Sequence, residues 1–231
     1  MPTQDFLAKA ARTSLRPAVA RHGFQQYSPK AFFRLCGKIV QFVDLQKSGW
    51  GGGNFAVNYF IFILVPHRKF IGSIFAGRFP RGKSGDGWWK SVPEEAAEES
   101  MQEVCSIFES FALPILDESM TLSGYATALR KHCQGAHSGH ASADMGIALI
   151  CDGKIEEGHR LVRKAEVDYR AFSAQFPGMK EPLWSDECAD QMARLSSAVE
   201  AGTHETLIEE WFQQSILTLK IDKKWKNDKK G

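Results

Sequence analysis

The sequence predicts an α+β protein in which an N-terminal helix and an antiparallel sheet of about four strands pack with a C-terminal all-helical region. Between Phe32 and Trp89, apolar and aromatic residues come in short runs typical of strands, whereas beyond Ser91 they recur at helical spacing. Hydrophobic residues make up 43% of the 231 residues, which is enough for a core. We expect an α+β domain at 1–113, a helical region at 114–221 and a basic disordered tail at 222–231.

The chain is expected to begin with a helix. Leu7, Ala11 and Leu15 fall on one helical stripe, Pro17 is expected to kink or divide the helix, and Gly23 suits its C-terminal stop. The first 17 residues carry charge throughout and lack an uninterrupted apolar core, so we expect neither a signal peptide nor a membrane anchor there.

Three apolar runs follow and predict an antiparallel meander. The run from Phe32 to Leu45, broken near Gly37, is typical of a β-hairpin. The strongest strand pattern is Asn54 to Leu64, and a further strand is expected from Phe70 to Phe79. The second of these runs is too short for a membrane helix.

Beyond Ser91 the pattern is helical. Pro93 and the glutamates after it favour the start of a long helix, and Pro114 is expected to end or bend it. Further helices are expected at 121–133, 142–151, 155–176, 187–201 and 205–221. The helices expected at 142–151 and 155–176 resemble one tetratricopeptide-like hairpin, with small residues such as Gly146 and Gly158 where the two helices could pack closely. No second copy follows at a fixed period.

Cysteine usage and net charge bear on compartment and partners. The five cysteines form no CxxC pair, which favours reduced thiols and a cytoplasmic location. A net charge of +2 favours neither nucleic acid nor an acidic partner. The exception is the basic tail from Lys220 to Gly231, with six lysines against two aspartates, which could hold nucleic acid electrostatically but is typical of a solvated tail.

The segment from Gly77 to Ser84, GRFPRGKS, satisfies the phosphate-loop pattern and makes Lys83 and Ser84 candidate nucleotide-binding residues. A phosphate loop must open a helix, because the helix N-terminus and the backbone N–H groups cradle the phosphates. Here Gly85, Asp86 and Gly87 follow, so the sequence lacks the first turns of that helix. The alternative interpretation is a basic glycine-rich loop.

A second group of candidates is a set of possible zinc ligands: His132, Cys133, His137 and His140. Imidazole and thiolate are suitable ligand types, but the spacing matches no standard site and no H-E-x-x-H glutamate accompanies it. A polar loop between helices explains these residues equally well. No other pattern indicates a cofactor, and we expect none.

The predicted sheet carries unexpected polar residues. Asp44 and Gln46 share one face of their strand, and Asn58 lies on one face of the next. Arg34 and Arg78 could join them from flanking strands. Such residues form either a hydrogen-bonded network that stabilises the sheet or the floor of a binding cleft, and the sequence leaves both open.

The same residues carry a resemblance. The strand from Phe32 to Arg34, Gln46 to Ser48 before a glycine loop, Phe55 with Asn58, Arg78, and Asp86 with Trp88 and Trp89 resemble a bacterial family, domain of unknown function 4304. The match covers about the first half of the chain. It implies a compact α+β module and no established activity, and Pro80 departs from the family pattern.

The sequence therefore favours a non-catalytic intracellular binding or protein-interaction module over an enzyme, with neutralisation of a partner protein as one role. Trp and Arg beside a flexible loop are typical of recognition surfaces. The expected binding surface comprises Arg34, Gln46, Lys47, Trp50, Asn58, Arg78, Asp86 and Trp88. The alternative is a nucleotide- or metal-dependent enzyme that uses the Gly77–Ser84 loop or the His132–His140 cluster. The sequence does not determine the oligomeric state.

Overall fold

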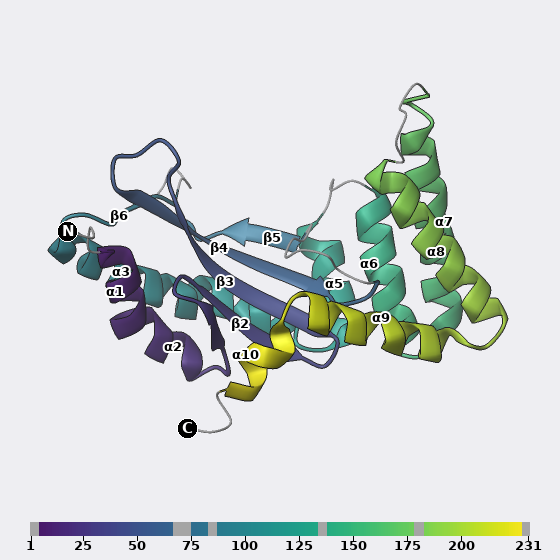
Figure 1. The fold of residues 1–231 in the computed structure, drawn as a ribbon, viewed down its shortest axis with the longest axis horizontal. Helices are drawn as coiled ribbons and strands as arrows, with labels where there is room; N and C mark the ends of the chain where they lie inside the picture. The colour runs from purple at the N-terminus through teal and green to yellow at the C-terminus, as the bar shows by residue number, and fades with distance from the viewer. Residues whose placement is uncertain (1–4, 67–74, 83–86, 134–137, 178–182, 228–231) are drawn as a thin grey trace. The chain divides into compact units, whose positions relative to one another are not determined.

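The computed structural model confirms an α+β fold with an antiparallel sheet and a C-terminal helical region (Figure 1). It describes residues 5–66, 75–82, 87–133, 138–177 and 183–227. The chain forms two compact units. The first comprises Met1–Ile61, Ala76–Asp117 and Lys220–Gly231, and the second comprises Phe62–Phe75 and Glu118–Leu219. The first unit therefore combines three segments, the last of them C-terminal, whereas the sequence predicted one continuous α+β domain at 1–113.

The N-terminal helix contains a π-helical stretch directly before its proline. It consists of α1 (Phe6–Ala10), the π-helical η1 (Ala11–Leu15) and α2 (Arg16–Ala20). Asp5 caps the first turn, where its Oδ1 accepts a hydrogen bond from the Ala8 N–H at 3.2 Å. Pro17 lies in the first turn of α2, where a missing N–H is tolerated because the hydrogen-bond pattern has just changed. The helical backbone therefore continues through this proline.

The sheet of the described chain has six strands in place of the four predicted. The strands are β1 (Gln25–Ser28), β2 (Ala31–Cys36), β3 (Ile39–Lys47), β4 (Asn54–Ile63), β5 (Phe75–Arg78) and β6 (Trp89–Lys90). Their order is β1-β2-β3-β4-β5, and β6 pairs with β4. The predicted hairpin is confirmed, because β2 and β3 pair antiparallel with Phe33 opposite Phe42. Residues 70–74 of the last predicted strand lie outside the described part of the chain.

The two additional strands have weak sequence patterns. β1 reads QQYS, and all four of its residues are half-buried, so it shows no clear apolar alternation. β6 is only two residues long, and it pairs Trp89 with Phe55 and Lys90 with Asn54. Neighbouring strands decide both elements, which is why the sequence pattern missed them.

One face of the sheet is covered by helices of the first unit. The covering helix consists of α3 (Glu94–Ile107), the π-helical η2 (Phe108–Ala112) and α4 (Leu113–Glu118). Phe111 of η2 contacts Tyr59 of β4 edge to face, with ring centroids 6.4 Å apart. Pro114 does not end the helix. As with Pro17, a π-helical stretch precedes the proline.

Within the described residues, the second unit is helical apart from the ends of β4 and β5. Its helices are α5 (Leu122–His132), α6 (Ser138–Cys151), α7 (Ile155–Ser173), α8 (Trp184–Glu200) and α9 (His204–Thr218). The predicted hairpin is formed by α6 and α7, and its glycines explain the close packing. A Cβ on Gly146 would lie 2.8 Å from the Gly158 carbonyl oxygen, and one on Gly158 would lie 2.6 Å from the Gly146 oxygen. None of the described helices has the length and apolar content of a membrane span.

The expectation of a disordered tail from residue 222 is wrong for its first half. Helix α10 (Ile221–Asn227) begins there and returns to the first unit. Ile221 is fully buried, and the Lys224 ammonium lies 5.9 Å from the centre of the Tyr27 ring. An apolar anchor and a cation over an aromatic ring thus order a segment whose composition alone indicated disorder.

Candidate functional site

The sheet separates the predicted binding residues onto two faces. Successive side chains of a strand point to opposite faces, so the side chains of Gln46 and Gln41, both in β3, point to opposite faces of the sheet. Gln41 pairs with Arg34 of β2 on the face that α4 covers, which we call the helix-covered face. Gln46 lies on the other face together with Asn58 of β4, and we call the exposed part of this face around Gln46 the open face.

Four predicted residues meet on the open face and form what we call the Arg78 cluster: Gln46, Asn58, Arg78 and Trp88. Gln46 and Asn58 come together because β3 and β4 form a hairpin, in which the Ser48 N–H donates to the Asn54 oxygen at 2.9 Å. Arg78 is the last residue of β5, which continues beside β4 through the bond from the Phe79 N–H to the Val57 oxygen at 2.9 Å.

Amide groups hold the Arg78 guanidinium in place. Asn58 donates through Nδ2 to Gln46 Oε1 at 3.0 Å. Arg78 donates through Nε to Asn58 Oδ1 at 3.2 Å and through Nη2 to Gln46 Oε1 at 3.5 Å. Its guanidinium carbon also lies 4.9 Å from the centre of the Trp88 ring, within cation–π distance. The cluster is thus ordered by neutral acceptors and an aromatic ring.

The Arg78 cluster carries positive charge on an exposed surface. Gln46 and Arg78 are exposed, while Asn58 and Trp88 are half-buried. Across the described part of the chain, no carboxylate forms an ion pair with Arg78. Lys90, which the sequence analysis did not single out, is exposed and pairs in register with Asn54 on β4. Only the pairing of β6 with β4 reveals it, since a two-residue strand has no recognisable period.

Trp50 and Lys47 lie outside the Arg78 cluster, in the β3–β4 loop and at the end of β3. Trp50 is 99% exposed and sits in the β3–β4 loop, where Gly51, Gly52 and Gly53 all have positive φ values. Lys47 instead turns to the N-terminal helix and forms an ion pair with Asp5 at 3.1 Å. Burial opposes ionisation of Asp5, but hydrogen bonds from Lys30, the Ala8 N–H and Lys47 outweigh it and lower its pKa to about 2.

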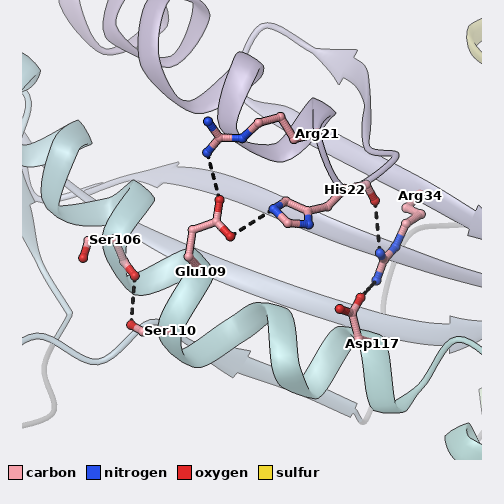
Figure 2. A network of polar contacts seen from close by, with 7 residues as sticks. All are labelled: Arg21, His22, Arg34, Ser106, Glu109, Ser110 and Asp117. Carbon is pink, nitrogen blue, oxygen red and sulfur yellow. Dashed lines mark hydrogen bonds and ion pairs between the residues drawn. The ribbon is translucent and has the colours of Figure 1, made fainter.

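Arg34 belongs to a separate network on the helix-covered face (Figure 2). It is 6% exposed and donates through Nε to Gln41 Oε1 at 2.8 Å, through Nη1 to the His22 carbonyl at 3.0 Å and through Nη2 to Asp117 Oδ1 at 2.8 Å. Its guanidinium also lies 4.7 Å from the centre of the Phe24 ring. With all three nitrogens bonded internally, Arg34 connects β2 to α4 and presents nothing to a partner.

The same network links α2 to the π-helical stretch η2. Figure 2 shows the Glu109 carboxylate between Arg21 and His22, at 3.0 and 2.9 Å. Burial opposes ionisation of Glu109, but its hydrogen bonds to these two residues lower its pKa below the ordinary range. These contacts hold the C-terminal end of α2 against η2, which is a structural role.

The phosphate-loop pattern begins inside a strand. Gly77 is the third residue of β5, and a Cβ there would lie 2.4 Å from the Tyr59 ring, so this glycine makes room for a buried tyrosine. Lys83, Ser84 and Asp86 lie outside the described residues. The next element after them is strand β6 and not a helix, so the described structure shows no helix N-terminus at this point to receive a phosphate.

The candidate metal ligands have separate contacts. The His132 ring stacks on Phe75 at 5.7 Å, whereas His140 stacks on Trp184 at 5.0 Å and shares a hydrogen bond of 2.8 Å with the Tyr169 hydroxyl. Burial raises the pKa of the Cys133 thiol, which disfavours the thiolate that binds zinc. His137 lies outside the described residues, among which no group of three His, Cys, Asp or Glu side chains could hold a metal ion.

One arrangement that the sequence did not indicate resembles a catalytic triad. His159 Nε2 lies 2.7 Å from Ser196 Oγ and 3.8 Å from Glu200 Oε1. In a working triad the acid binds the other ring nitrogen and orients the imidazole. Here both partners reach the same nitrogen, and Ser196 lies inside helix α8, where backbone N–H groups are already bonded and cannot stabilise an oxyanion. The arrangement is therefore not catalytic.

Comparisons with known proteins give no relative. No family model matches the chain, and neither the curated proteins nor the solved structures contain a match to it. The resemblance to domain of unknown function 4304 therefore remains a prediction.

Proposed function

We propose that this protein is a non-catalytic intracellular binding protein that recognises a partner protein through its open face. The observation that carries the proposal is the Arg78 cluster, in which an exposed guanidinium is held in one orientation by two amide side chains and a tryptophan ring. A side chain that is already ordered loses little conformational entropy when it binds, so it contributes more of its contact energy to affinity.

The residue types around the cluster support a protein partner. Tryptophan and arginine are the residues that most often dominate the binding energy of protein interfaces. Trp50 adds a fully exposed indole ring on the neighbouring glycine loop, where it can enter a pocket on a partner. A stable complex of this kind is consistent with a role in neutralising the partner, as expected from the sequence.

The proposal is tested by capture of partners from the source organism with the full chain as bait. Wild-type protein and the variants Arg78→Ala, Trp50→Ser and Arg194→Ala are compared by quantitative mass spectrometry. Arg194 is the matched control, because it lies 5.5 Å from the centre of the Trp211 ring in the helical unit and is also exposed. The Arg194→Ala change removes a comparable contact between an arginine and a tryptophan ring that does not belong to the open face.

We expect a protein that wild type and Arg194→Ala retain and that Arg78→Ala and Trp50→Ser lose. With the purified partner, Arg78→Ala is expected to weaken the Kd by about 30-fold, which corresponds to about 2 kcal/mol, the magnitude of an interface hot spot. Equal retention by all variants contradicts the proposal, as does the absence of any specific protein. Circular dichroism and the thermal midpoint serve to show that each variant is folded.

A further inference from the structure

We infer that the open face binds a carboxylate of an acidic peptide segment, with Arg78 as its anchor; this inference rests on the proposed function and specifies the chemistry of the partner. A guanidinium has two edges that can each hold a planar acceptor: the side edge, with Nε and Nη2, and the end edge, with Nη1 and Nη2. In Arg78 the side edge is occupied, because Nε donates to Asn58 and Nη2 to Gln46.

Among the described residues, the end edge of Arg78 is the one left for a ligand. Neither Nη1 nor the second Nη2 hydrogen finds an acceptor among the described residues. The Trp88 ring lies 4.9 Å from the guanidinium carbon and adds a cation–π contact without using any of its N–H donors. Two parallel N–H donors in a plane match the two oxygens of a carboxylate, and a point charge such as lysine lacks this match.

The charges around Arg78 favour a carboxylate-bearing peptide over a nucleic acid. Lys90 is a second exposed cation on this sheet without an ion-pair partner in the described chain, whereas Lys47 is already paired with Asp5. Two available cations suit a segment with a few acidic residues, but nucleic-acid affinity comes from many simultaneous phosphate contacts.

Asn58 is the positioning residue of this site. Its Oδ1 accepts from Arg78 Nε, and its Nδ2 aligns Gln46, which is the other acceptor. The variant Asn58→Ala keeps every charge and the Trp88 ring but frees the guanidinium to rotate. If binding depended on net charge alone, this change would leave the Kd for an acidic peptide unaltered.

The test is a titration of the full chain, labelled with ¹⁵N, at low ionic strength, where surface charges are least screened. The probes are a hexaglutamate peptide, a hexathymidylate oligonucleotide and inorganic phosphate. The signals are the Nε–H group of Arg78 and the indole N–H of Trp88, which report on this site even if the lysine-rich C-terminal segment also binds a probe. The control is Arg16→Lys, a charge-conserving change at an exposed arginine of α2.

We expect hexaglutamate to shift both signals, with a Kd that rises about fivefold or more in Arg78→Lys and in Asn58→Ala and stays unchanged in Arg16→Lys. An unchanged Kd in Arg78→Lys overturns the inference, because a point charge would then suffice. Stronger binding of hexathymidylate or phosphate at these signals overturns it in favour of a phosphate ligand. If hexaglutamate leaves Arg78 unperturbed while a captured partner still requires Arg78, the inference fails and the proposed function stands.

Discussion

Arg34 and Arg78 carry the same side chain and were expected on one surface, so their replacement by methionine tests the division between the two faces. Methionine keeps much of the apolar stem and removes the guanidinium. In Arg34→Met, the oxygens of Gln41 and His22 and the Asp117 carboxylate lose a charged donor. In Arg78→Met, only the amide oxygens of the half-buried Asn58 and the exposed Gln46 lose a donor.

The contacts of Arg34 set the size of the expected effect. Gln41 is fully buried, so its Oε1 is left without a donor, at about 1–3 kcal/mol. Breaking a fully buried ion pair costs about 3–5 kcal/mol, but the Asp117 side chain is 48% exposed and regains water, which reduces this contribution. We therefore expect Arg34→Met to lower the free energy of unfolding by about 3 kcal/mol, and Arg78→Met by about 1 kcal/mol or less.

Urea unfolding followed by circular dichroism measures both variants. Because the chain has two units, the comparison uses the transition of the sheet-containing unit and requires an unchanged m value. Asp117→Asn is a second variant, since it keeps an acceptor for Arg34 and removes only the charge. If Arg34→Met loses less than about 1 kcal/mol, or if Arg78→Met loses as much, the assignment of Arg34 to structure is refuted.

Three further predictions concern the glycine motif, a titrating carboxyl and ligands. Gly77→Ala is expected to lower the free energy of unfolding by about 1–3 kcal/mol through overpacking against Tyr59, and by less in a Tyr59→Leu background; an equal loss in both backgrounds contradicts the contact. Because the folded pKa of Asp5 is lowered from 3.8 to about 2, its contribution is present above pH 4 and lost as the pH falls to 2. With Asp5 partly exposed, the difference in unfolding free energy between wild type and Asp5→Asn should be about 1 kcal/mol at pH 5 and shrink at pH 2.5, whereas a constant difference argues against the shift. In thermal-shift assays we expect no stabilisation by Mg–ATP or zinc, although a bound ligand at a hundred times its Kd would add about 2.7 kcal/mol; a nucleotide shift abolished by Lys83→Ala would support the phosphate loop instead.

Part of the candidate site could be predicted from the sequence because side-chain alternation is a local property. Gln46 and Asn58 interrupt otherwise apolar strands, and alternation predicts each as a polar position on one face of its own strand. The hydrogen bond between their side chains, 3.0 Å long, agrees with that placement. Arg78 at the end of β5 was expected to join them, and it does.

The sequence could not assign Arg34 to a face. The residue lies in a strand whose neighbours Phe32 and Phe33 are both buried, so the usual contrast between an apolar and a polar side is missing. Only the register with β3, which places Arg34 opposite Gln41, and the bond from Gln41 to the Leu116 carbonyl at 2.6 Å show that α4 covers it.

The amino-acid sequence by itself determined the order of the helices from α1 to α9 and of strands β2 to β5, together with the hairpin of β2 and β3. It also determined the close packing of α6 on α7 and the polar residues of β3 and β4, because local periodicity and side-chain size specify these features. The tertiary structure alone decided the strands β1 and β6, the helix α10 and the separation of Arg34 from Arg78. These features depend on contacts between residues far apart in the chain, such as Arg34 with Asp117 and Lys224 with Tyr27, and no local pattern encodes such contacts.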